Sequence, residues 1–175
     1  MTRKKGFSII ELLVVISIIA VIAGVLLPAL RRARLMAWRT ACASNLHQVA
    51  IGLISYLDDN NQIMPPASEK PSLKLDDKKS IAEILNPILR DPEVFLCPGD
   101  SGRILWQAEG SSYAYNSLMG GQTVSRSFFS TKLNVPEQNI HVMYDYECFH
   151  GKAKQKGAKN YLYADGHVGD IKEQK

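Results

Sequence analysis

The hydrophobic pattern of the chain begins with a long apolar segment that has no polar face. Residues 7–30 are apolar on all sides of a helix, whereas a surface helix of a soluble domain carries a single apolar stripe. As a helix these 24 residues would extend about 36 Å. A bilayer core is roughly 30 Å thick and needs about 20 apolar residues. A buried core helix is the alternative, but such helices are usually shorter. We therefore predict a membrane-spanning helix.

Two residues depart from a plain membrane anchor. Glu11 places a carboxylate near the start of the apolar segment. A carboxylate in hydrocarbon costs several kcal/mol and usually has a partner or a function. It either reaches the nearby interface or makes a polar contact with another chain inside the membrane. Pro28 predicts a helix kink, because proline removes one backbone hydrogen bond.

Beyond the apolar segment, the pattern changes to that of an amphipathic helix. Hydrophobic residues recur there at spacings of three and four. They are Leu35, Trp38, Cys42, Leu46, Val49, Leu53 and Leu57. We expect the helix to continue to about Leu57 and to end in the polar residues 58–61, since Pro65 and Pro66 rule out continuation. This stripe must pack against the rest of the chain.

The remaining residues predict a small head of mixed structure. Residues 60–79 are typical of a loop, and the capping-box pattern from Ser80 to Glu83 predicts a short helix that reaches about Leu85 and ends near Pro87. Four short strands are expected after it. Their candidate ranges are 104–107, 112–116, 124–130 and 140–146.

The clearest turn lies near the C-terminus. Asp165-Gly166 separates the strand-forming residues 160–164 from residues 167–171, which predicts a β-hairpin. The lysine-rich residues 151–159 predict an exposed, mobile loop. The expected fold class is α+β, with a long N-terminal helix packed on a small antiparallel sheet.

The start of the chain resembles a known processing signal. The residues after Leu30 form a poor small-residue site for a secretory signal peptidase. In contrast, Lys4-Lys5-Gly6-Phe7-Ser8-Ile9-Ile10-Glu11-Leu12-Leu13-Val14 resembles the leader of type IV pilins and type II secretion pseudopilins, and Pro28 lies where they carry a helix-weakening proline. The expected segments are therefore a leader (1–6), a transmembrane and assembly helix (7–30), its amphipathic continuation (31–60) and a head (61–175).

This resemblance implies specific roles for three N-terminal residues. A membrane prepilin peptidase would cut between Gly6 and Phe7 on the cytoplasmic side and methylate the new amine of Phe7. Glu11 would pair with the Phe7 amine of a neighbouring subunit during assembly. An ammonium and a carboxylate, each costly when buried alone, are tolerable together.

A second resemblance is to a branch of pseudopilin-like proteins with a C-terminal His…Asp-Gly motif. It is carried by residues 45–60, 95–100, 112–113 and 165–168. In that motif the histidine usually precedes Asp-Gly by about ten residues, whereas here His150 precedes Asp165 by 15.

Charge does not indicate nucleic-acid binding. The formal net charge is +4, and loss of the leader with its three basic residues would lower it to +1. No strong basic face remains to contact phosphates, so no nucleic acid is expected as a partner. Basic residues flank both ends of the apolar segment, so charge does not orient it in the membrane. The resemblance puts the N-terminus in the cytoplasm.

The three cysteines permit one disulfide if the head is exported. Cys97 and Cys148 are the candidate pair, because both lie in the head, and Cys42 is interpreted as a small packing residue of the helix. A free pair of thiols in the head is the alternative.

Other chemistry has weaker support in the sequence. A metal site from Cys97, Cys148, His150, Asp165 and His167 lacks the paired close spacings of zinc sites. A calcium site could draw on Asp145, Glu147, Asp165 or Asp170, but no ligand loop is recognisable. A hydrolase built from Cys148, His150 and Asp165 rests only on the proximity of the first two. We expect no catalytic residues, no resident metal and no cofactor.

The sequence is best interpreted as a pseudopilin-like structural subunit of a type II secretion-like system in a bacterial inner membrane, with a periplasmic head. Its expected partners are a prepilin peptidase, other subunits and an inner-membrane assembly platform. The alternatives are a type IV pilin for adhesion or DNA uptake, and a membrane-anchored binding module that does not polymerise.

Overall fold

The computed structural model describes residues 9–74, 77–153 and 155–170. The chain divides into two compact units, Met1–Met36 and Ala37–Lys175. The helix α1 (Ile9–Asp59) contributes residues to both units. It ends within the polar cluster 58–61 as predicted, and it continues through Pro28 without a break. A kink at Pro28 stays a prediction.

In the first unit, α1 exposes apolar side chains around its circumference. The most apolar stretch of the helix is long enough to cross a membrane and has no residue buried within the chain. Ser17 is polar, but its hydroxyl donates to the Leu13 carbonyl at 2.7 Å, so it needs no partner from water. The first unit therefore has the surface of a helix that is covered by lipid or by other chains.

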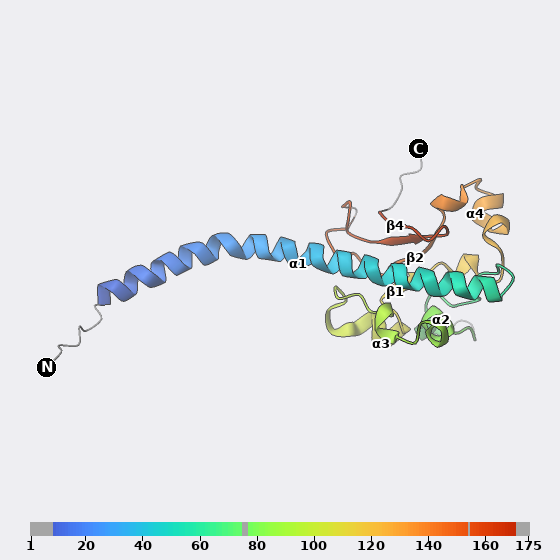
Figure 1. Cartoon of the computed structure of the whole chain (residues 1–175), viewed down its shortest axis with the longest axis horizontal. Coiled ribbons are helices and arrows are strands. Elements are labelled where there is room, and N and C mark those ends of the chain that lie inside the picture. Colours follow the sequence, from blue (N-terminus) through green and yellow to red (C-terminus); the bar gives the residue numbers. More distant parts are fainter. Residues whose placement is uncertain (1–8, 75–76, 154, 171–175) are drawn as a thin grey trace. The chain divides into compact units, whose positions relative to one another are not determined.

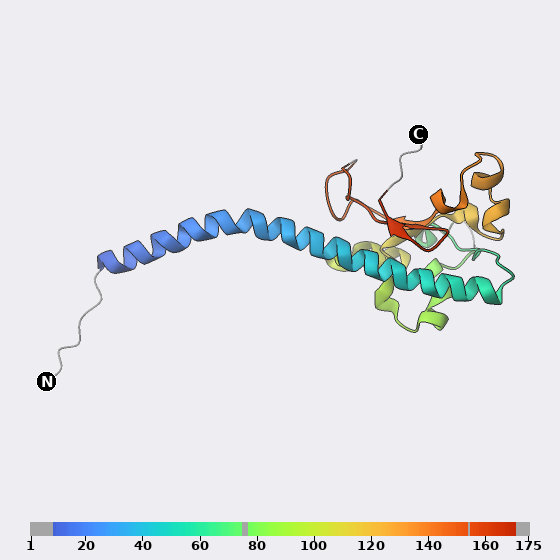
Figure 2. The ribbon, with the colours of Figure 1, turned by 45° about the horizontal axis from the view of Figure 1, so that its top comes forward.

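In the second unit, α1 supplies one side of the hydrophobic core. Six of the seven predicted stripe residues belong to this unit; five of them are buried and Trp38 is partly buried. The buried five are Cys42, Leu46, Val49, Leu53 and Leu57. Figures 1 and 2 show this part of α1 between the sheet on one side and the segment with α2 and α3 on the other.

The helix α2 (Ile81–Leu89) begins where the capping box predicts. The Ser80 side chain accepts from the Glu83 backbone N–H at 3.1 Å, and the Glu83 carboxylate accepts from the Ser80 N–H at 3.2 Å. The helix does not end at Pro87 but continues two residues further, to Leu89. Gly52 of α1 allows its close approach, because a Cβ at Gly52 would lie 2.7 Å from the Leu89 Cγ.

Two of the predicted strands are wrong. Residues 104–107 belong to the helix α3 (Ile104–Glu109), because the Asp100 carboxylate accepts from the backbone N–H groups of Leu105 and Trp106 at 3.4 and 3.0 Å. Residues 124–130 form a 3₁₀ turn (Val124–Arg126) and the short helix α4 (Phe128–Thr131). Here the Ser127 side chain accepts from the Ser130 N–H. At both places, a side chain that accepts from backbone N–H groups stabilises the start of a helix, and this effect is stronger than the strand propensity of the residues.

The other strand predictions are confirmed. Strands β1 (Tyr113–Tyr115), β2 (His141–Asp145), β3 (Tyr161–Tyr163) and β4 (Val168–Gly169) form one antiparallel sheet in the order β1-β2-β3-β4. The register pairs Ala114 with Tyr144 and Leu162 with Val168, and it is irregular between His141 and Met143. The α+β fold class is thus confirmed.

The Asp165-Gly166 hairpin is also confirmed, and it joins β3 to β4. The Gly166 N–H donates to the Tyr163 carbonyl, and the Tyr163 N–H donates to the His167 carbonyl, both at 2.9 Å. Gly166 has a φ of +86°, which residues with a side chain rarely adopt. The hairpin therefore has a three-residue loop with glycine at its left-handed position.

His141 gives the sheet a pH dependence. Its ring packs edge-on against Tyr144 and Tyr161, and burial lowers its pKa below the ordinary value of 6.5. As pH falls below 6.5 the unfolded chain takes up this proton before the folded chain does, so the free energy of unfolding decreases. We expect His141→Gln to make this decrease shallower. Urea unfolding of both proteins in detergent, between about pH 7.5 and about pH 5.5, measures the difference. Parallel pH profiles would contradict this role.

Candidate functional site

The first candidate site is the start of α1, where the resemblance places assembly. Glu11 lies in the first turn of the helix, within the exposed apolar surface of the first unit. Gly6 and Phe7 lie outside the described residues, so the predicted cleavage and methylation positions have no structural description. The chemistry available here is that of a carboxylate at one end of a long apolar helix surface.

The second candidate site is a disulfide, and it corrects the expected pairing. Cys42 of α1 is bonded to Cys97, and Cys148 is a free thiol. The expected Cys97–Cys148 bond is therefore wrong, as is the interpretation of Cys42 as a mere packing residue. The predicted stripe turns Cys42 into the core, toward the turn that carries Cys97. Both cysteines are fully buried.

A side-chain hydrogen bond from α1 holds the Cys97 turn in place, and two further contacts close the turn itself. The Asn45 side chain donates to the Leu96 carbonyl at 2.8 Å, and the Asp100 N–H donates to the Cys97 carbonyl at 2.9 Å. The Gly99 N–H lies 3.4 Å from the Cys97 Sγ. A Cβ at Gly99 would lie 2.7 Å from the Phe149 Cβ, so this glycine allows the segment before His150 to approach.

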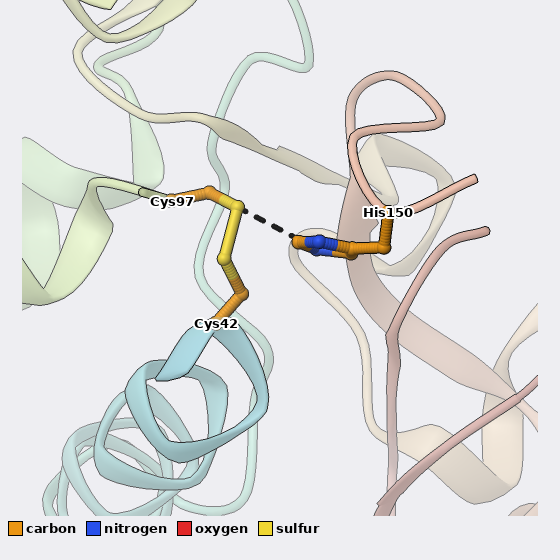
Figure 3. A group of neighbouring side chains, drawn as sticks. All are labelled: Cys42, Cys97 and His150. Atoms are coloured by element: carbon orange, nitrogen blue, oxygen red, sulfur yellow. Dashed lines mark hydrogen bonds between the residues drawn. A yellow bond between two sulfur atoms is a disulfide. The ribbon is translucent and has the colours of Figure 1, made fainter. Parts of the chain in front are cut away.

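His150 completes the buried cluster and points its ring at the disulfide (Figure 3). Its Nε2 lies 3.6 Å from the Cys97 Sγ and 3.1 Å from the Asp145 Oδ2. Neither the His150 nor the Asp145 side chain has exposed surface. The Asn160 N–H also donates to the Asp145 Oδ2, at 2.7 Å. The cluster therefore joins α1, the Cys97 turn, the end of β2 and the segment before β3.

The structure does not assemble the hydrolase considered from sequence. His150 contacts Asp145 and Cys97, whereas Asp165 accepts from the His167 N–H in the exposed hairpin and contacts the His167 ring. The Tyr163 ring stacks on His167 with centroids 4.3 Å apart. Asp165 and His167 thus act together as hairpin residues. Cys148, the nucleophile of that hypothesis, is a free, partly buried thiol.

The acidic residues considered for calcium have separate partners. Asp145 contacts His150, Asp165 contacts His167, and Asp170 pairs with Arg39 at 3.2 Å. Asp170 also accepts from the Gly157 N–H at 3.0 Å, and Gly157 and Ala158 are buried although the sequence predicts an exposed loop there. Calcium binding by these residues stays a prediction.

The position of Asp145 is the feature that the sequence does not predict. Asp145 ends β2 after the buried apolar residues Val142 and Met143, and only the fold brings it to His150. A usable signal was the presence of Cys42 in the apolar stripe, since a stripe residue faces the core and can reach the cysteine of a packed turn.

Comparison with known proteins gives two matches. Residues 1–27 match the family model described as the prokaryotic N-terminal methylation motif. The chain is also similar to the type IV wide pilus major component PilA4 of Thermus thermophilus, with 36% identity over 110 residues. That alignment covers 62% of this chain and 82% of the relative. No solved structure matches the chain.

Proposed function

The chain belongs to the type IV pilin family, and on that premise we propose that it is a structural subunit of a type IV pilus. The supporting observation is the exposed apolar surface of α1, with Glu11 in its first turn and a prepilin motif over residues 1–27. A membrane-anchored subunit of this kind needs no catalytic residue.

The proposed cycle starts in the bacterial inner membrane. A prepilin peptidase cuts between Gly6 and Phe7 and methylates the new amine of Phe7 on the cytoplasmic side, while the head lies in the periplasm. Lipid covers the apolar part of α1 until an assembly platform inserts the subunit into a filament. Copies of the same helix then replace the lipid, so the apolar surface stays out of water throughout.

A type IV pilin is favoured over the secretion pseudopilin that the sequence first indicated. The similar protein is a pilus component, and the chain covers 82% of its length. A pseudopilin of a type II secretion-like system uses the same leader and helix, so filament length separates the two. Long surface fibres containing this chain support the pilus, and fibres confined to the cell envelope support the pseudopilus.

Intact mass of the membrane-extracted protein tests the proposal. Co-expression with an active prepilin peptidase should remove Met1–Gly6 and add one methyl group to Phe7. Co-expression with an inactivated peptidase should leave the full chain. A Gly6→Val variant is the matched control in this chain, and we expect it to stay uncut beside the active enzyme. A cut after the apolar segment, or no cut at all, would overturn the proposal.

A further inference from the structure

The disulfide shares its buried site with groups that a disulfide does not require. His150 and Asp145 have no exposed side-chain surface, and their Nδ1 and Oδ1 atoms have no hydrogen-bond partner among the described residues. A buried polar atom without a partner costs about 1–3 kcal/mol. The other nitrogen of the same ring, Nε2, lies beside the Cys97 Sγ and the Asp145 Oδ2.

The cluster offers the donor set of a zinc site. Within residues 9–74, 77–153 and 155–170, one group of three histidine, cysteine or acidic side chains could hold a metal ion. Its members are Cys42, Cys97 and His150, whose donor atoms all lie within 4.8 Å of one another. Thiolate sulfur and imidazole nitrogen are the ligands that zinc prefers in proteins. We propose that the chain with reduced cysteines binds one Zn²⁺ through Cys42, Cys97 and His150.

The geometry requires little rearrangement. Around a tetrahedral zinc ion, with bonds of about 2.3 Å to sulfur and about 2.0 Å to nitrogen, neighbouring sulfur and nitrogen ligands lie roughly 3.5 Å apart. Cys97 Sγ and His150 Nε2 are already 3.6 Å apart. The two sulfur atoms must separate to roughly 3.8 Å, and the Cys42 Sγ, which lies within 4.8 Å of the other two donor atoms, must come to roughly 3.5 Å from the His150 Nε2. The Asp145 Oδ2, 3.1 Å from the same nitrogen, is an oxygen donor beside the fourth position.

The two states of the site are related by a balanced exchange. An external dithiol gives two electrons to the Cys42–Cys97 bond and closes to a disulfide itself, and its two protons leave two thiols on this chain. Zinc binding then releases those two protons as the thiolates coordinate. Oxidation by a disulfide reverses the sequence: the Sγ–Sγ bond forms again and the zinc ion is released.

Both states join α1 to the Cys97 turn. The disulfide does so covalently, and the zinc ion would do so through coordination while the thiols are still reduced. A chain that has crossed the membrane before its cysteines are oxidised would thus already hold the two sulfur atoms together. This role concerns the folding of the head and does not depend on filament assembly.

Cobalt and zinc binding by the full chain in detergent micelles test the proposal. After reduction with a phosphine, which avoids competition from a chelating dithiol, we expect one Zn²⁺ per chain after desalting. Co²⁺ should give the visible bands of a tetrahedral site and a near-ultraviolet thiolate charge-transfer band. The oxidised wild-type protein, identical in sequence, should give neither.

Variants separate this site from adventitious binding. Cys148→Ser removes the free thiol outside the cluster and should leave one ion per chain, whereas Cys97→Ser and His150→Gln should weaken cobalt binding at least tenfold. If either variant fails to fold, the presence or absence of the thiolate charge-transfer band in the reduced wild type with Co²⁺ still tests the proposal. No retained metal in the reduced wild type, or equal retention in Cys97→Ser and Cys148→Ser, would overturn the proposal.

Discussion

Cys97→Ser is expected to lower the free energy of unfolding of the head by about 4 kcal/mol. The Cys42–Cys97 bond closes a loop with a sequence separation of 55, and a cross-link of this length restricts the unfolded chain strongly. It also ties α1 to the turn that carries Cys97 inside the core. Urea unfolding of the full chain in detergent, followed by near-ultraviolet circular dichroism, measures the loss.

The three cysteines provide the controls for this result. Cys42→Ser and the double variant Cys42→Ser/Cys97→Ser should cost the same as Cys97→Ser, because all three remove one bond. Cys148→Ser should leave the unfolding midpoint unchanged. Reduction of the wild type in the presence of a metal chelator should reproduce the loss. A destabilising Cys148→Ser, with a Cys97–Cys148 peptide in a non-reducing digest, would contradict the observed pairing.

The long helix, its buried stripe, the capping box and the C-terminal hairpin could all be predicted from sequence because their signals are local. Ser80 and Glu83 are three residues apart, and Asp165-Gly166 forms its turn with its immediate neighbours. The helix α3 was missed because its capping residue, Asp100, acts from five and six residues away across a 3₁₀ turn. Strand propensity is a property of the residues themselves and gives no information about a contact from a residue outside the segment.

The buried cluster could be predicted only in part. Its histidine and cysteines are visible in the sequence, but their partners depend on how the turn after Phe95 packs on α1. Asn45 fixes that turn through the Leu96 carbonyl, and Gly99 lets the His150 segment approach. Neither contact can be inferred from spacing along the chain, so the assumption that both bonded cysteines lie in the head selected the wrong pair.

Glu11→Ala is expected to abolish filament assembly while the protein stays in the membrane. In the proposed filament this carboxylate pairs with the Phe7 amine of a neighbour, and removing one partner of a buried pair costs about 3–5 kcal/mol. A loss of that size lowers the assembled fraction about a hundredfold or more. Alanine makes the apolar helix more hydrophobic, so membrane retention should not fall. Sheared filaments and membrane fractions, quantified by immunoblot, measure both pools.

Ser17→Ala is the matched control for loss of a polar group in the same helix. The Ser17 hydroxyl already donates to Leu13 within its own chain, so its removal should leave assembly unchanged. Glu11→Gln keeps the shape and hydrogen-bonding capacity but not the charge, and it should assemble as poorly as Glu11→Ala if the ion pair is what matters. If Glu11→Ala loses its leader completely and still forms normal filaments, the charge pair is not needed for assembly and the prediction is contradicted. Such a result would leave the apolar surface of α1, rather than the charge pair, as the determinant of subunit packing.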